Sequence, residues 1–434
     1  MNAPALPSRP RFDLASRLSS VLQSYAGVIK TESYFPLWLG QLISNFGDTV
    51  HYIALVVLVF RLSGQALVVG GVVAAEVLPL LILGPVAGVV VDRLNRRGVL
   101  IGADVCRAAL ALSLVWPQGV WHAYVVAAGM AAAGSFFNPA LQAVIPAVTT
   151  EQQRLAANSV AWSTGRLVQI IAAAVAGGVI ALIGTGPSFA LNAASFGVSA
   201  LLITRLRLRS LATNEGASTL GVRMASYLEQ ARVGLHYAAG QRSLARLLLV
   251  QALASLATGG TSAMLVVLAE RHFHLQPAGF AWFIGAIGVG ALLGPLIPNV
   301  LGANYRKGRW LYTPYVIRGA GDVLLAIVTP VPAGLVLLFV YGLNTSTGVV
   351  VFNSMLQTRV PDELRGRVFT LFDMTWGACR LVSLVLGGLL ADRAGIEPLY
   401  WAGGSLLAIA GLIGLVGDAK EVSIVTEGHP ATIG

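Results

Sequence analysis

The stretch Leu67–Gly98, which reads LVVGGVVAAEVLPLLILGPVAGVVVDRLNRRG, contains the two features that decide the fold. Residues 67–91 are almost entirely apolar, and they exceed the about 20 residues that a helix needs to cross a bilayer. A short loop with several charged residues follows directly. This pattern predicts a transmembrane helix that ends at a basic membrane edge.

Similar apolar segments recur along the whole chain. Of its 434 residues, 56% are hydrophobic and only 11% are charged, whereas soluble proteins carry roughly 25% charged residues. We therefore expect an all-α polytopic membrane protein, not an enzyme, with twelve transmembrane helices. Their predicted extents are 35–60, 67–91, 99–116, 121–145, 156–183, 187–204, 244–269, 278–301, 311–329, 333–357, 369–390 and 398–417.

The basic residues predict the orientation of these helices. If both termini are cytoplasmic, 22 of the 29 Lys and Arg residues fall in cytoplasmic segments, which is a strong positive-inside bias. The net charge of +10 therefore indicates orientation and not a nucleic-acid partner. We expect a cytoplasmic tail, a six-helix bundle, a cytoplasmic linker, a second six-helix bundle and a cytoplasmic tail, at 1–33, 34–204, 205–243, 244–417 and 418–434.

The two halves of the chain resemble each other at an offset of about 210 residues. The matched stretches are Leu83-Gly84-Pro85 with Leu293-Gly294-Pro295, Arg96-Arg97-Gly98 with Arg306-Lys307-Gly308, and Gln41 with Gln251. Two parallel six-helix repeats are typical of transporters whose substrate site lies between the repeats, near the membrane centre.

Three stretches then point to a family. Gly88-x-x-x-Asp92-Arg93-x-Asn95-Arg96-Arg97 resembles the signature loop of the major facilitator superfamily, with Asn95 where the family usually has Gly. Asn45-Phe46-Gly47-Asp48 and Asp104-x-x-Arg107-Ala108 are similar to the branch that contains the enterobactin exporter and the macrolide efflux pumps. Of the Gly-Pro-x-x-Gly-Gly run common in proton-coupled exporters, only Gly177-Gly178 remain.

The resemblance implies a secondary transporter of the bacterial inner membrane that works by alternating access. We expect proton-coupled efflux of an amphipathic small molecule of the drug, macrolide or siderophore class. The alternatives are an importer or sodium-coupled carrier, and a membrane sensor or lipid-handling protein on the same scaffold. The resemblance also implies that the loop residues latch the two halves together on the cytoplasmic side: Gly88, Asp92, Arg93, Asn95, Arg96 and Arg97.

Acidic residues inside spans are costly and are therefore candidates for coupling. Asp48 and Glu76 lie deep in the first and second predicted helices, where burial favours an uncharged carboxyl group that can exchange a proton. His51, about one turn beyond Asp48, is a candidate proton relay. A structural hydrogen bond or ion pair between helices is the alternative role for each acid.

Four further charged residues within the predicted spans form two pairs, each on one helix. Two arginines within the spans have no such pairing. Asp104 with Arg107, and Arg318 with Asp322, are spaced to share a helix face and are interpreted as structural pairs. Arg166 and Arg380 need an anionic partner, which is either a substrate or one of the acids Asp48, Glu76 and Asp373.

We add Asn45, Gln41 and Gln251 as candidates for the cavity wall. The sequence predicts no metal site, no cofactor and no ATP-binding loop. The expected partners are the substrate, protons and the lipid bilayer, and the expected state is a monomer.

Overall fold

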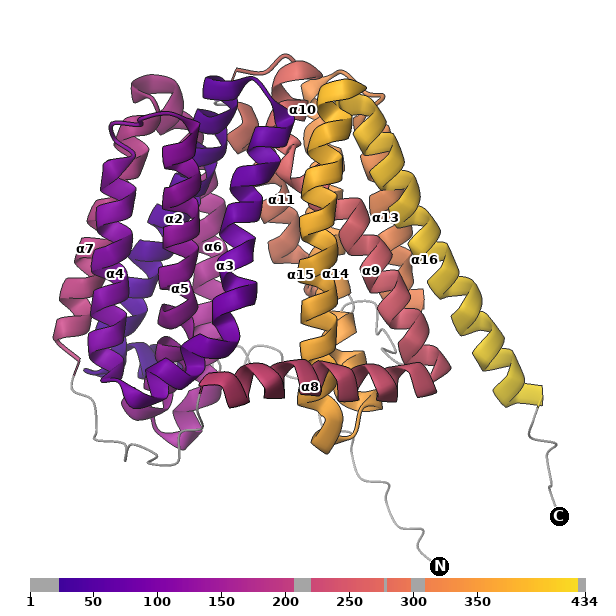
Figure 1. Ribbon diagram of the computed structural model, residues 1–434, viewed down its shortest axis with the longest axis horizontal. Coiled ribbons are helices and arrows are strands. Elements are labelled where there is room, and N and C mark those ends of the chain that lie inside the picture. The colour runs from indigo at the N-terminus through magenta and orange to yellow at the C-terminus, as the bar shows by residue number, and fades with distance from the viewer. Residues whose placement is uncertain (1–22, 207–219, 277–278, 298–308, 428–434) are drawn as a thin grey trace, which may run out of the picture.

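The computed structural model describes residues 23–206, 220–276, 279–297 and 309–427, and helices make up nearly all of this part of the chain (Figure 1). The all-helical membrane fold is therefore confirmed. The first half contains α2 (Tyr34–Ser63), α3 (Ala66–Arg93), α4 (Arg96–Ser113), α5 (Val120–Val148), α6 (Glu151–Ile183) and α7 (Thr185–Thr204). The second half contains α9 (Arg242–Ala263), α10 (Leu265–Arg271), α11 (Gly279–Leu293), α13 (Arg309–Leu325), α14 (Val331–Arg359), α15 (Asp362–Arg393) and α16 (Ile396–Glu427).

Each predicted span coincides with at least part of a described helix. Nine of the described helices are long and apolar enough to cross a membrane by length and composition. The remaining three predicted spans correspond to α4, α11 and α13, which have 18, 15 and 17 described residues.

The two halves use the same packing scheme. In the first half, α2 packs on α6 and α7, α3 packs on α5, and α4 packs on α5 and α7. In the second half, α9 packs on α15 and α16, α11 packs on α14, and α13 packs on α14 and α16. Each of these contacts in one half thus has its counterpart in the other, as expected for two pseudo-repeats. The halves meet through α3 against α15 and α6 against α11.

The predicted span 244–269 is not one continuous helix. It breaks at Met264, between α9 and α10. Gly259 and Gly260 weaken the helix before the break, and the Thr258, Thr261 and Ser262 hydroxyls bond back to carbonyls of the preceding turn. The apolar pattern of the sequence predicts one continuous helix here, because it does not depend on these local effects of glycine and hydroxyl side chains.

A further helix, α8 (Leu220–Gly240), lies across one end of the bundle, roughly perpendicular to the other helices (Figure 1). It contacts α3, α9 and α15, and so touches both halves. Gly234 allows the close approach to α15, because a Cβ atom there would lie 2.5 Å from the carbonyl oxygen of Arg367. We call this side the α8 end and the opposite side the far end.

Candidate functional site: a cavity beneath a closed far end

The two ends of the molecule are packed differently. At the far end, one apolar core joins both halves, because Val50–Phe60 of α2 and residues of α3 pack together with Met264–Ala269 and parts of α11 and α15. At the α8 end, the buried apolar residues form separate clusters, one confined to the first half and another to the second. The halves are therefore held together at the far end and are separate cores at the α8 end.

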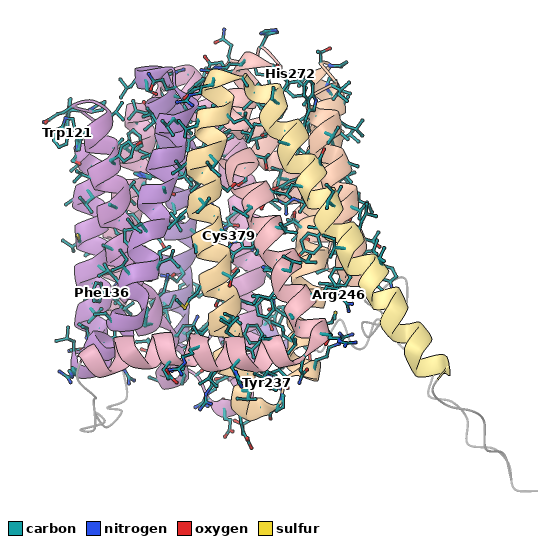
Figure 2. All side chains as sticks on the ribbon, turned by 45° about the vertical axis from the view of Figure 1, so that its right-hand side comes forward. Trp121, Phe136, Tyr237, Arg246, His272 and Cys379 are labelled. Carbon is teal, nitrogen blue, oxygen red and sulfur yellow. The ribbon has the colours of Figure 1, made fainter. Side chains whose placement is uncertain are left out.

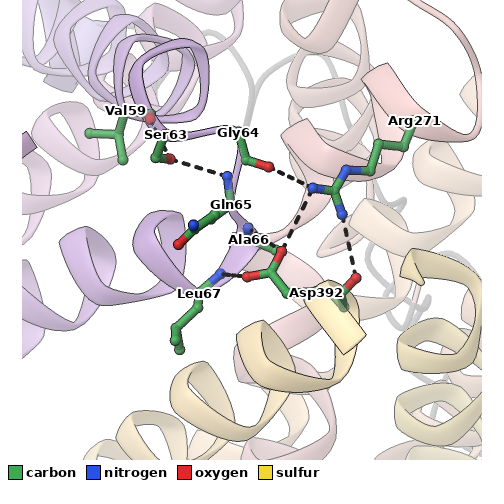
Figure 3. A network of polar contacts seen from close by, with 9 residues as sticks. Val59, Ser63, Gly64, Gln65, Ala66, Leu67, Arg271 and Asp392 are labelled. Carbon is green, nitrogen blue, oxygen red and sulfur yellow. Dashed lines mark hydrogen bonds and ion pairs between the residues drawn. The ribbon is translucent and has the colours of Figure 1, made fainter. Parts of the chain in front are cut away.

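A polar network ties the halves together at the far end (Figure 3). Asp392, near the end of α15, accepts hydrogen bonds from the backbone N–H groups of Ala66 and Leu67, both at 2.8 Å. These groups belong to the first turn of α3, whose own N-cap residue, Gln65, provides no side-chain cap. Asp392 thus caps a helix of the other half, where the helix dipole favours a negative charge.

Arg271, at the end of α10, completes this network. Its guanidinium donates to the carbonyl oxygen of Gly64 at 2.6 Å and to that of Ala391 at 3.4 Å, and it lies 3.6 Å from the Asp392 carboxylate. We call Arg271, Asp392 and the α2–α3 turn the far-end latch. It joins the first half to two helices of the second.

Glycines allow α3 and α15 to touch along the far half of their lengths. A Cβ atom at Gly388 would lie 2.5 Å from the Leu67 Cα atom, and one at Gly70 would lie 2.8 Å from the Leu384 carbonyl oxygen. Such positions exclude larger side chains without movement of the helices. This interface is therefore built for close contact in the state described.

A cavity of about 500 Å³ lies in the second half, between α9, α13, α14 and α15. Its size is typical of pockets for drug-sized molecules. Its wall combines aromatic rings, amides and charges: Tyr315, Tyr341, Phe352, Phe372, Trp376, Gln251, Asn344, Asn353, Arg318, Asp373 and Arg380. Arg380 lies near the middle of α15, because its neighbour Cys379 is about halfway along this helix (Figure 2).

Two of the five predicted cavity residues line this cavity. Gln251 accepts a hydrogen bond from the Tyr315 hydroxyl at 3.2 Å, and Arg380 lies on the α15 wall. Arg166, Asn45 and Gln41 are not among its lining residues. Arg166 is exposed on α6 and donates to Gln169, whereas the amide nitrogen of Gln41 is buried with no hydrogen-bond partner in the described part of the chain.

The candidates for proton coupling lie in the first half. Asp48 is half-buried on α2, next to the Asn192 side chain of α7, and its charge interacts with those of Arg107 and Asp104. The charge of Glu76, on α3, interacts with Arg380 across the two halves. His51 is buried edge-on against Phe189, with ring centroids 5.1 Å apart, and neither ring nitrogen has a hydrogen-bond partner among the described residues.

The two predicted intramembrane pairs have different geometries. Asp104 and Arg107 form an ion pair at 2.5 Å, and the guanidinium also lies between the rings of Phe137 and Phe196. Arg318 donates to the Tyr341 hydroxyl and stacks 3.9 Å from the centroid of that ring, and its charge interacts with that of Asp322. Asp322 is buried, and one of its carboxylate oxygens has no hydrogen-bond partner in the described part of the chain.

The signature loop makes contacts within its own half. Asn95 caps α4 by accepting from the Arg97 N–H at 3.1 Å. The side chains of Arg96 and Arg97 donate to the carbonyl oxygens of Ala143 and Thr204, both in the first half. Gly88 lies near the end of α3, the exposed Arg93 is its last residue, and the side chain of Asp92 lies outside the described part of the chain.

The sequence contains two signals for the residues of the far-end latch. If both termini are cytoplasmic, three basic residues fall in segments outside the cytoplasm, namely Arg61, Arg271 and Arg393. Such rare charges are candidates for specific contacts. The pair Asp392-Arg393 at the end of α15 repeats Asp92-Arg93 at the end of α3. Tyr341 of the cavity wall carries no comparable signal, and Arg318 is interpreted from its spacing as a structural partner of Asp322.

The comparisons with known proteins fit this architecture. The sequence pattern of one family, described as transmembrane secretion effector, matches residues 24–426. The chain is 29% identical to the multidrug efflux pump Tap of Mycolicibacterium fortuitum over 83% of its length and 90% of the pump. It is 22% identical to macrolide efflux protein A of Streptococcus pyogenes, over 90% and 97% of the two chains.

The fold is also found among solved structures. The crystal structure of the nucleoside transporter NupG superposes with a TM-score of 0.72 at 12% identity, and the match covers 88% of this chain and 98% of that one. At this identity the likeness concerns the fold alone.

Proposed function

The chain belongs to the transmembrane secretion effector family of the major facilitator superfamily, whose members are membrane transporters, and we propose that it exports an amphipathic small molecule by proton-coupled alternating access. The observation that carries this proposal is the asymmetry of the two ends: a closed far end above a cavity, and separate cores at the α8 end. A transporter that takes its substrate from the α8 side requires this arrangement in one of its two states.

We assign the α8 end to the cytoplasm. This end holds the predicted cytoplasmic basic residues that the structure describes, among them Arg96, Arg97, Arg154 and Arg242, as the positive-inside rule requires. The far end carries few basic residues. Among the arginines that the structure describes at this end, Arg271 is the one with a hydrogen-bond partner. The cavity is then loaded from the cytoplasm of a bacterium, with both chain termini on the same side.

Reporter fusions test this orientation. A reporter that is active only outside the cytoplasm should be silent after Arg97, Ser218 or Lys307 and active near Gly119, Gly186 or Val331. The charge bias of the loops sets this expectation. The reversed pattern at two or more of these sites would contradict the assignment.

The helices α3 and α15 can cap each other, once at each end of the molecule. In the described state, Asp392 of α15 caps the N-terminus of α3 at the far end. At the α8 end, Asp92 of α3 is placed in sequence to cap α15, whose N-cap residue, Pro361, offers no side-chain cap. We infer that the two caps alternate, because closing one end requires that α3 and α15 separate at the other.

The direction of transport and the driving ion are part of the proposal. Export is supported by the two relatives whose printed names describe efflux. Proton coupling is supported by Asp48 and Glu76, two carboxylates within the membrane spans that make no ion pair with a described residue. Asp48 is our first candidate, and the substrate class extends to drugs, macrolides and siderophores.

Drug accumulation in cells tests the function. Cells that lack their own drug pumps and express this protein should accumulate less erythromycin than cells with an empty vector, and a protonophore should remove the difference. Asp92→Asn should lower the efflux rate while the amount of protein in the membrane stays the same. Equal accumulation of erythromycin and of a panel of other amphipathic drugs, with and without the protein, would contradict export.

A further inference from the structure

The cavity wall contains two arginines that form no ion pair with a described residue. The charge of Arg318 interacts with that of Asp322, which lies one turn further along α13. Arg318 is fixed against Tyr341 by a hydrogen bond and by ring stacking, and its Nε atom is buried without a hydrogen-bond partner among the described residues. Arg380 forms neither a hydrogen bond nor an ion pair with any residue that the structure describes, and its charge interacts with Glu76 and Tyr341. Both residues are half-buried, and a half-buried guanidinium group favours an anionic partner.

The two arginines act on the same place. The Tyr341 hydroxyl interacts with the charges of both Arg318 and Arg380, which come from α13 and α15. It also interacts with the charge of Asp322, which is buried on α13 and is not among the residues that line the cavity. The Tyr341 ring, on α14, holds one of these guanidinium groups in a fixed orientation. An anionic group in the cavity therefore faces guanidinium groups from two different helices, because both arginines line its wall.

The acidic residue of the wall lies elsewhere. Asp373 is on the same helix as Arg380 but seven residues before it, which is ~10 Å along a helix axis. It is nearer the α8 end, whereas Arg380 is at mid-depth. Between these levels the wall offers rings, including Phe372 and Trp376 on α15 itself.

We propose that the cavity takes an anionic aromatic amphipath, whose carboxylate, phenolate or sulfonate group binds between Arg318 and Arg380 while its rings stack on the aromatic wall. Guanidinium groups bind such oxyanions through paired, charge-assisted hydrogen bonds. A membrane potential that is negative inside also favours the exit of an anion. This proposal rests on the proposed function only for the direction of movement.

Two xanthene dyes of opposite charge provide the test. The full-length protein in nanodiscs of uncharged lipid is titrated against anionic fluorescein and cationic rhodamine 123, and binding is followed by fluorescence anisotropy. We expect tighter binding of fluorescein. Arg380→Gln should weaken fluorescein binding at least about tenfold and leave rhodamine 123 nearly unchanged.

Matched variants separate charge from shape. Asp373→Asn removes a charge from the same wall and should retain or improve fluorescein binding. Arg318→Gln should reproduce the loss seen with Arg380→Gln and serves in its place if that variant does not fold. A preference of the unmodified protein for rhodamine 123, or equal losses for both dyes in Arg380→Gln, would overturn the proposal.

Dye efflux from cells separates this proposal from the proposed function. Expulsion of rhodamine 123 but not fluorescein would leave export intact and overturn the anion site. Fluorescein binding with the predicted variant pattern, but no efflux of any compound, would support the anion site and overturn export.

Discussion

Asp48→Asn should abolish uphill transport driven by a pH gradient while substrate exchange across the membrane persists. Asparagine keeps the size of the side chain beside Asn192 but cannot exchange a proton. With one proton exchanged per substrate, a pH difference of one unit supports roughly a tenfold substrate gradient. We expect that gradient in proteoliposomes with the unmodified protein and none with the variant.

Glu76→Gln is the matched control for this experiment. Glu76 is also within a span, but its charge interacts with Arg380 of the cavity wall, so its loss should alter substrate affinity more than coupling. If Asp48→Asn builds a normal gradient and Glu76→Gln does not, Glu76 is the coupling residue. Normal gradients in both variants would contradict proton coupling through these helices.

Asp392→Asn should shift the resting protein away from the state with the closed far end. The variant replaces a charged cap of α3 by a neutral one and removes the ion pair with Arg271. Because both side chains are partly exposed, we expect a loss of about 1–2 kcal/mol. This changes the ratio of the two states roughly 5- to 30-fold.

Spin-label distances measure this shift. One label pair, at Leu62 and Ile327, reports on the far end, and another, at Arg154 and Glu363, reports on the α8 end; all four positions are exposed. The two natural cysteines, Cys106 and Cys379, are replaced first. The control is Arg393→Gln, which removes the exposed charge beside Asp392 and should leave both distances unchanged. An unchanged far-end distance in Asp392→Asn would show that this latch does not hold the state.

The helices and their places in the two halves could be predicted from the sequence, because apolar length and loop charge act locally. The far-end latch could not be, since Asp392 caps a helix more than 300 positions earlier in the chain. Such a cap depends on where two helix ends meet in space. Two features of the sequence pointed towards it: the repeated Asp-Arg pair at the ends of α3 and α15, and the rare basic charge of Arg271.

The cavity arginines illustrate a second limit. Arg166 and Arg380 were both predicted to need an anionic partner, because both lie within predicted spans. Depth along a helix does not fix the direction of a side chain, because successive residues turn around the axis. Arg166 is exposed beside Gln169, whereas Arg318, expected to pair with Asp322 on its own helix, lines the cavity with Arg380.

The central claim is that the two ends of one molecule open alternately, and the two label pairs test it directly in the otherwise unmodified chain. Without substrate, the Leu62–Ile327 distance should be short and the Arg154–Glu363 distance long. During turnover with a pH gradient and an exported substrate, a second population of molecules should appear. Its far-end distance should be longer and its α8-end distance shorter, and both label pairs should report the same fraction of molecules in this population. Far-end and α8-end distances that lengthen together, or a far-end distance that stays constant while substrate is transported, would contradict the account.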